Sequence, residues 1–172
     1  AAINIFPALD AKRDIIQNAI DLWTGVGLGR PRVAILSAVE TVTQKIPSTI
    51  EAAALCKMAD RGQITGGLLD GPLAFDNAIS VEAARTKGIR SEVAGHADVL
   101  IVPDLESGNM LAKQLSYLAG AEAAGIVMGT RVPVALHECD HRYQHPGFRP
   151  RSLPHPAIWQ GQSLFQSPCS GM

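Results

Sequence analysis

The chain has 172 residues, of which 47% are hydrophobic and 18% are charged, and its formal net charge is −1. This length suffices for one domain that folds without disulfides or a structural metal, and the balanced charge argues against nucleic acid or an anionic membrane as a partner. No apolar run approaches the roughly 20 residues of a membrane-spanning helix. Cys56, Cys139 and Cys169 form no C-x-x-C pair, which argues against a disulfide framework and predicts a cytoplasmic protein.

Residues 1–136 alternate between segments with helical periodicity and short apolar runs typical of strands. The expected helices are residues 11–23, 49–62, 81–88 and 110–123, and the expected strands lie within residues 32–37, 64–76, 97–104 and 124–136. Asp10 and Ser48 are expected to open the first two helices. Cys56, among alanines, is expected to be a buried apolar residue and no nucleophile. These repeated units predict an α/β fold whose mostly parallel sheet carries helices on both faces.

Ligands in such folds bind beyond the carboxyl ends of the strands. The candidate loops are therefore residues 37–42, 69–77 and 103–109. In the last of them, Ser107, Gly108 and Asn109 lead into a helix whose unpaired N–H groups suit a phosphate or sulfate. Ser107 or Asn109 could instead be a helix N-cap, which is the commoner use of such residues. Asp70 and Asp76 fit either an acid/base pair or two carboxylates that stabilise a Gly-Pro turn, the turn being the simpler interpretation.

Residues 137–172 differ abruptly in composition from the rest of the chain. They hold four of the five histidines and five of the eleven prolines, and no helical or two-residue period continues there, which argues against a packed element. The segment begins with His137-Glu138-Cys139-Asp140-His141, the H-E-x-x-H pattern of zinc hydrolases. That pattern requires a helix and a third ligand, whereas here it directly follows a strand-like "VPVAL". A zinc hydrolase is therefore the least favoured alternative.

Three stretches, "LLDGPLAFDNAIS", "VAGHADVLIVPDLESGN" and "AEAAGIVMGTRVPV", resemble in order and spacing the phosphate acetyltransferase and phosphate butyryltransferase family. The likeness runs from about Ile3 to Leu136, and it is closest to the branch that includes the C-terminal part of bifunctional enoyl-CoA hydratase/phosphate acetyltransferases. It implies that residues 1–136 are the second of two domains of isocitrate/isopropylmalate dehydrogenase-like fold, and that residues 137–172 are an atypical tail. It further implies a homodimer with the active site between the two domains.

The same resemblance implies transfer of an acyl group between coenzyme A and inorganic phosphate, which yields an acyl phosphate. Coenzyme A is then a substrate, and neither a cofactor nor a metal is expected. The residues expected to contact the substrates are Asp70, Gly71, Pro72, Asp104, Ser107, Gly108 and Asn109. Arginine and hydrogen-bond donors would stabilise the phosphate and the tetrahedral intermediate, and a carboxylate would deprotonate the thiol.

The chain departs from the family where the tail begins. An active-site Ser-Arg pair is expected after "VPVAL", but Glu138 and Cys139 occupy those positions. Because this change coincides with the break in composition after Leu136, we hypothesise that a change of reading frame altered the tail. The expected function is therefore a truncated acyltransferase with impaired catalysis, and the alternative is a non-catalytic domain that dimerises.

Overall fold

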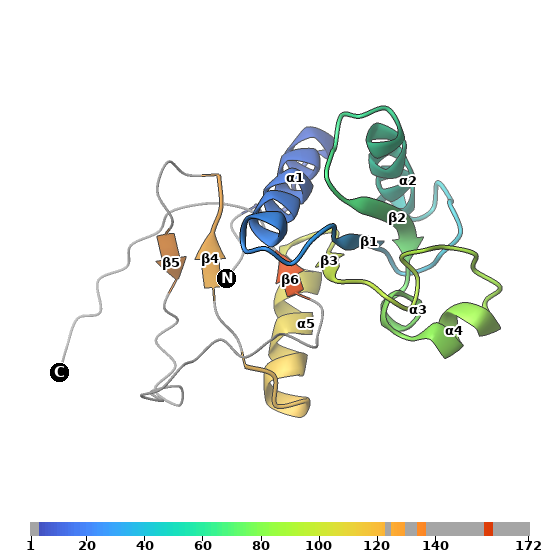
Figure 1. The fold of residues 1–172 in the computed structure, drawn as a ribbon. Helices are drawn as coiled ribbons and strands as arrows, with labels where there is room; N and C mark the ends of the chain where they lie inside the picture. The colour runs from blue at the N-terminus through green and yellow to red at the C-terminus, as the bar shows by residue number, and fades with distance from the viewer. Residues whose placement is uncertain (1–3, 123–124, 130–133, 137–156, 160–172) are drawn as a thin grey trace.

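The computed structural model describes residues 4–122, 125–129, 134–136 and 157–159 (Figure 1). In this part of the chain, no helix is long and apolar enough to cross a membrane. The elements, in chain order, are α1 (Leu9–Gly25), β1 (Arg32–Leu36), α2 (Pro47–Asp60), β2 (Leu68–Leu73), α3 (Phe75–Ile79), α4 (Val81–Thr86), β3 (Val99–Ile101), α5 (Leu105–Leu118), β4 (Gly125–Val127), β5 (Val134–Leu136) and β6 (Ala157–Trp159).

The main sheet is parallel throughout, with strand order β2-β1-β3-β6. The central strand β1 pairs with β2 on one side and with β3 on the other, so that Ala34 lies between Asp70 and Leu100. β4 and β5 form a separate antiparallel pair. The α/β class and the parallel sheet predicted from the sequence are therefore confirmed, and the two strands β4 and β5 agree with the one or two strands predicted within residues 124–136.

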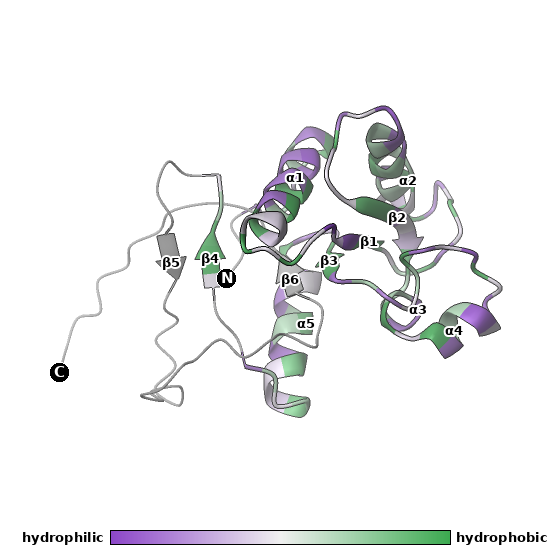
Figure 2. Ribbon diagram, viewed as in Figure 1, coloured by the Kyte–Doolittle hydropathy of each residue, from purple (hydrophilic) through white to green (hydrophobic). Residues whose placement is uncertain are grey.

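Alternate residues of β1 face opposite layers of helices. Val33 and Ile35 pack with α1 and α2, whereas Ala34 and Leu36 pack with α3, α4 and the segment before β3. α1 accordingly carries hydrophobic residues on one side and hydrophilic residues on the other (Figure 2). Each fully buried Ile or Leu contributes about 1.5–3 kcal/mol relative to an exposed one. The strands read as continuous apolar runs because both faces of the sheet are covered.

Helix starts differ from the predicted ones. α1 has Ala8 at its N-cap, so that Asp10 lies inside the first turn, where its charge still favours the helix dipole. α2 has Ile46 at its N-cap, two residues before the predicted cap Ser48, and Pro47 is its first residue. Proline is suited to this position because its missing N–H would have no partner there.

The short helix α3 was not predicted, since five residues are too few to establish a helical period. Ser80 follows it and caps α4 by accepting a hydrogen bond from Ala83 N at 3.2 Å. The chain therefore turns after β2, and the two short helices α3 and α4 cover the second face of the sheet.

The prediction that residues 137–172 contain no packed element is wrong for residues 157–159. These form β6, which pairs in parallel with β3 along Val99–Ile101. Pro156 directly precedes the strand, a position where proline's missing N–H is tolerated. The rest of the tail lies outside the described residues.

Candidate functional site

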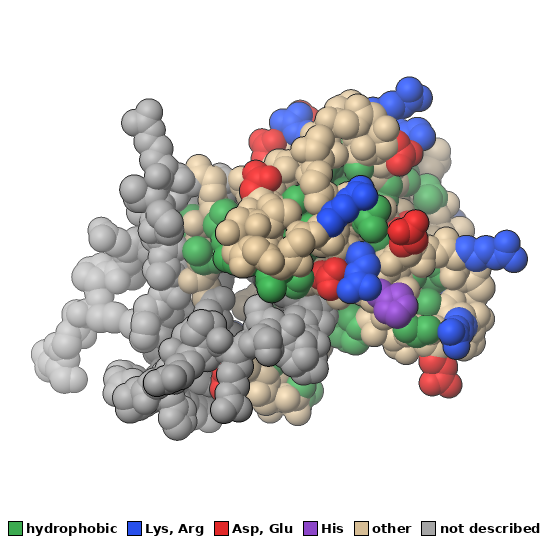
Figure 3. Space-filling model, in the orientation of Figure 1, with side chains coloured by type: hydrophobic (Ala, Val, Ile, Leu, Met, Phe, Trp, Pro, Cys, Tyr) green, Lys and Arg blue, Asp and Glu red, His purple; other side chains and the backbone are tan. Residues whose placement is uncertain are grey.

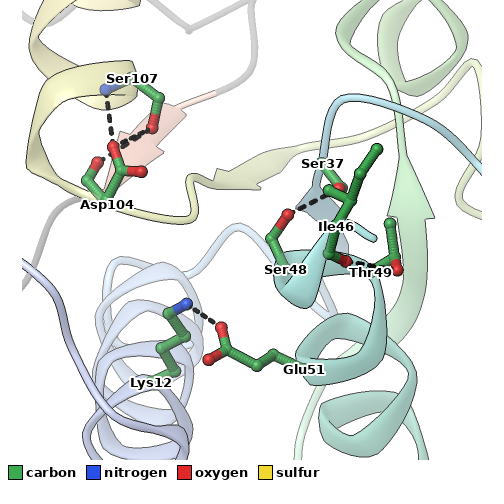
Figure 4. A network of polar contacts seen from close by, with 8 residues as sticks. All are labelled: Lys12, Ser37, Ile46, Ser48, Thr49, Glu51, Asp104 and Ser107. Carbon is green, nitrogen blue, oxygen red and sulfur yellow. Dashed lines mark hydrogen bonds and ion pairs between the residues drawn. The ribbon is translucent and has the colours of Figure 1, made fainter. Parts of the chain in front are cut away.

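The carboxyl ends of β1 and β3 and the first turns of α2 and α5 lie at one edge of the main sheet, as expected of parallel strands joined to helices. Figure 4 shows the polar groups gathered there: Ser37 and Ser48, Asp104 and Ser107, and the pair formed by Lys12 and Glu51. This edge, which we call the carboxyl edge, is the candidate site. The fold class predicted its position in advance.

Asp104 caps α5. Its Oδ1 accepts hydrogen bonds from Ser107 N at 2.8 Å and from Ser107 Oγ at 2.7 Å. The prediction that Ser107 or Asn109 is the N-cap is therefore wrong: both lie inside the first turns, Asn109 exposed and Gly108 buried. A carboxylate at this position already satisfies an N–H group and offsets the positive end of the helix dipole. The start of α5 is thus capped by Asp104, which satisfies one of its free N–H groups.

Ser37 and Ser48 form a hydroxyl pair between the end of β1 and the start of α2. Their Oγ atoms are 2.8 Å apart, and Ser37 is buried. The loop between them contacts Thr49, whose one hydroxyl proton is shared between Ile46 O at 2.7 Å and Thr43 O at 3.0 Å, and whose Oγ1 accepts from Thr43 N at 2.9 Å. These hydrogen bonds tie the loop to the first turn of α2 at the carboxyl edge.

Lys12 and Glu51 were missed by the sequence reasoning. Lys12 Nζ donates to Glu51 Oε2, joining α1 to α2, and the Lys12 side chain is only 7% exposed. The two residues are far apart in the chain, and each has the spacing of an ordinary solvated charge on a helix. No signal in the sequence could have paired them.

Asp70, Gly71 and Pro72 do not form a loop, contrary to the prediction, because they lie within β2. Asp70 Oδ1 accepts from Gly71 N at 2.8 Å, which supports the reading of this carboxylate as a partner of nearby backbone. A Cβ at Gly71 would approach Ile35 O within 2.7 Å. Glycine is therefore needed for close contact between β2 and β1, and the Gly71–Pro72 peptide is cis. Asp76 lies exposed in the first turn of α3.

Cys56 is only partly buried and packs against the apolar core of the α1 and α2 layer, so the prediction of a buried residue holds in part. Burial, and then the charges of Asp70 and Asp60, raise the pKa of its thiol to about 12. Its Sγ lies 3.6 Å from Gly71 O, to which the thiol donates. A thiol that stays protonated at neutral pH is a weak nucleophile, so Cys56 is not a candidate for covalent catalysis.

The residues of the H-E-x-x-H pattern, including Glu138 and Cys139, lie outside the described part of the chain. Within that part, no group of three or more His, Cys, Asp or Glu side chains could hold a metal ion. Lys, Arg, Asp and Glu side chains are interspersed on the face shown in Figure 3, without one sign dominating it.

Comparisons with known proteins agree with the resemblance found in the sequence. The family described as Phosphate acetyl/butaryl transferase matches residues 1–138. A "Phosphate acetyltransferase" of Rhizobium meliloti is 77% identical over 136 residues, which are 79% of this chain and 43% of that protein. A "Probable phosphate butyryltransferase" of Bacillus subtilis is 49% identical over 136 residues, 79% of this chain and 46% of that protein.

A solved structure supports the same assignment. A branched-chain phosphotransacylase from Enterococcus faecalis superposes with a TM-score of 0.73 at 35% identity, covering 80% of this chain and 49% of that one. The chain thus spans less than half the length of these relatives. With the parallel sheet and its two helical layers, the comparisons show that the chain belongs to the phosphate acetyl/butyryl transferase family.

Proposed function

We propose that the chain is a phosphate acyltransferase unit that moves an acyl group between coenzyme A and inorganic phosphate, giving an acyl phosphate and free coenzyme A. The observation that carries this proposal is the 77% identity with a protein named phosphate acetyltransferase. Two substrate classes occur among the names of the relatives, acetyl and butyryl. In both classes, a phosphate oxygen or the thiol of coenzyme A attacks an activated acyl carbon. Coenzyme A is a substrate, and we propose no further cofactor.

The carboxyl edge is the proposed place where the substrates contact this chain. Asp104 and Ser107 lie there, and exposed Asn109 offers an amide to a phosphate oxygen or to coenzyme A. Pro72 and Gly108 are buried, so we assign them, with Asp70 and Gly71, to shaping the surface that the substrates approach.

Catalysis by this chain is proposed to be impaired. The family resemblance places a serine and an arginine where Glu138 and Cys139 stand, which exchanges a cation and a hydroxyl for a carboxylate and a thiol. Removing one group that stabilises charge in the transition state lowers turnover about 10²–10³-fold. We expect the chain to convert acetyl phosphate and coenzyme A far more slowly than its Rhizobium meliloti relative does.

The test is formation of acetyl-coenzyme A, followed by absorbance of the thioester. In the triple variant His137→Thr, Glu138→Ser, Cys139→Arg, turnover should rise about 100-fold or more. The matched control places the same three residues elsewhere in the tail, as Tyr143→Thr, Gln144→Ser, His145→Arg, and should change nothing. A parent chain as fast as its relative would refute the impairment.

The same assay separates the alternatives. If neither the parent chain nor the triple variant binds coenzyme A or forms product, acyl transfer by this chain is wrong and the non-catalytic domain is favoured. A hydrolase that depends on zinc would lose its activity on chelation, whereas the proposed acyltransferase should keep its activity.

We also propose that the chain acts in the cytoplasm as a homodimer. Apolar side chains of α5 are exposed, with Leu118 85% and Met110 60% accessible, and such a surface is a candidate for contact with a second copy. Sedimentation of the parent chain beside a Met110→Lys, Leu118→Lys variant tests this proposal: a parent chain that sediments as a monomer would refute it.

A further inference from the structure

The strand β2 has one residue more than β1 between two of the pairs that join these strands. They are in register up to the pair of Ala34 and Asp70, and the next pair is Leu36 with Leu73. Between these pairs β1 has one residue and β2 has two, residues 71–72, which is the arrangement of a β-bulge. Because a bulge interrupts the hydrogen bonds between strands, its polar groups need partners from elsewhere.

Two side chains supply such partners at Gly71. Asp70 Oδ1 accepts a hydrogen bond from Gly71 N at 2.8 Å. Cys56 in α2 donates its thiol proton to Gly71 O, with its Sγ 3.6 Å away, and the thiol keeps this proton at neutral pH because burial raises its pKa to about 12. Pro72, the second residue of the bulge, has no N–H to satisfy. The bulge is therefore held by a side chain of β2 itself and by one of α2.

The bulge decides which residue of β2 lies at the end of β1. Without the extra residue, Pro72 would stand opposite Leu36, because a shift of one residue reverses the alternation of a strand. With it, Leu73 stands there, and both leucines are buried in the layer formed with α3 and α4. Leu73 O then accepts from Ser37 N at 2.9 Å. The backbone of Ser37, whose hydroxyl pairs with that of Ser48, is thus bound by the residue that follows the bulge.

We propose that Asp70 and Cys56 are positioning residues, which hold the bulge of β2 and thereby place Ser37 at the carboxyl edge. The connection runs through Leu73 O, the acceptor of Ser37 N, and neither positioning side chain touches a substrate. α2 contributes twice, because Ser48 in its first turn contacts the Ser37 hydroxyl and Cys56 further along contacts the bulge. The hydroxyl pair is then held through its backbone and through its side chains. That this pair faces a substrate rests on the proposed function.

The first test compares the NMR signals of the parent chain, Asp70→Ala and Asp70→Asn. Alanine removes the acceptor of Gly71 N, so this amide should exchange its proton about fivefold faster or more, as expected for a hydrogen bond worth about 1 kcal/mol. The amide-proton signal of Ser37 should move upfield, because its hydrogen bond to Leu73 O lengthens. Asparagine keeps an acceptor oxygen and should leave both amides as they are in the parent chain. A loss of stability alone would not move the Ser37 signal, which comes from the folded protein, and an unmoved signal in Asp70→Ala would overturn the proposal.

A second pair of variants keeps the proposal testable if Asp70→Ala does not fold. Cys56→Ala removes the donor to the bulge and should move the Ser37 signal in the same direction by less, since a thiol is a weak donor. Cys56→Ser keeps a donor and should restore at least part of the parent signal. The matched control is Lys57→Ala, at the neighbouring position of α2, where the side chain is exposed and makes an ion pair within the helix. An equal shift in Lys57→Ala, or none in Cys56→Ala, would overturn the role of the thiol.

Binding of coenzyme A, used as the probe, tests the link to the proposed function. Affinity should fall about fivefold or more in Asp70→Ala, which corresponds to about 1 kcal/mol, and should be kept in Asp70→Asn and in Lys57→Ala. Equal affinity in the parent chain and in Asp70→Ala, together with a moved Ser37 signal, would overturn the positioning role in substrate binding. If the parent chain does not bind coenzyme A while the Ser37 signal moves as expected, the proposed function is wrong and the positioning of Ser37 stands.

Discussion

Replacing Asp104 by alanine should weaken the fold measurably, because this carboxylate has two separable roles at the start of α5. It accepts hydrogen bonds from Ser107 N and Ser107 Oγ at 2.8 and 2.7 Å, and it places a negative charge at the positive end of the helix. Loss of an N-cap costs about 1 kcal/mol, and loss of the charge costs about 0.3–1 kcal/mol more. We expect Asp104→Ala to lower the free energy of unfolding by about 1.3–2 kcal/mol.

The assay is urea denaturation monitored by circular dichroism. The midpoints of the variants are compared, provided that the unfolding free energy depends on urea concentration with the same slope in each. Asp104→Asn is the matched control, since asparagine caps helices about as well as aspartate and removes only the charge; it should cost about 0.5 kcal/mol. An Asp104→Ala protein that loses less than about 0.5 kcal/mol would refute the assignment as a cap. Equal losses in the two variants would show that the charge, and not the hydrogen bonds, holds the start of α5.

Three further substitutions test contacts between the strands of the main sheet and between its helices. Lys12→Met should cost about 2 kcal/mol in urea denaturation, because it leaves Glu51 without its partner, although Glu51 is 35% exposed and regains some water. Gly71→Ala should cost about 1–3 kcal/mol in the same assay, because the added methyl group meets the backbone of β1. Burial alone would raise the pKa of Asp98, but hydrogen bonds from Arg32 outweigh it and lower that pKa. This contribution to stability is present above the unfolded pKa of about 4 and is lost as pH falls below it, so Asp98→Asn should flatten the loss of stability in acid.

Each of these substitutions has a comparison that isolates its cause. Adding Glu51→Met to Lys12→Met removes the unpaired charge, and should restore part of the lost stability. Gly25→Ala tests alanine where a Cβ meets nothing within 4 Å, and should change stability by less than about 0.5 kcal/mol. Asp14→Asn, which removes an exposed carboxylate on α1, is the matched control for Asp98→Asn.

The sequence predicted the edge of the sheet at which the polar groups gather better than it predicted how those groups contact one another. Apolar periodicity located the strands, and parallel topology then placed residues 37–42 and 103–109 at one edge. The sequence alone could not identify the N-cap of α5, because Asp104, Ser107 and Asn109 all have side chains that cap helices. Only the exact start of the helix decides between them. The role of Lys12 was hidden for a different reason: its partner comes from another helix, and tertiary packing alone brings the two together.

The strand β6 shows how little sequence is needed to extend this sheet. Without β6, Val99–Ile101 would present an open edge of N–H and C=O groups, to which any short apolar segment within reach could pair. Ile158 and Trp159 have high strand propensity, and backbone hydrogen bonds supply the rest. The pairing of β6 therefore does not require that evolution shaped the tail for it. The family match ends at residue 138, next to the break in composition at residue 136, and the frame-change hypothesis predicts both. Encoding DNA in which no other frame after Leu136 restores a Ser-Arg pair would refute it.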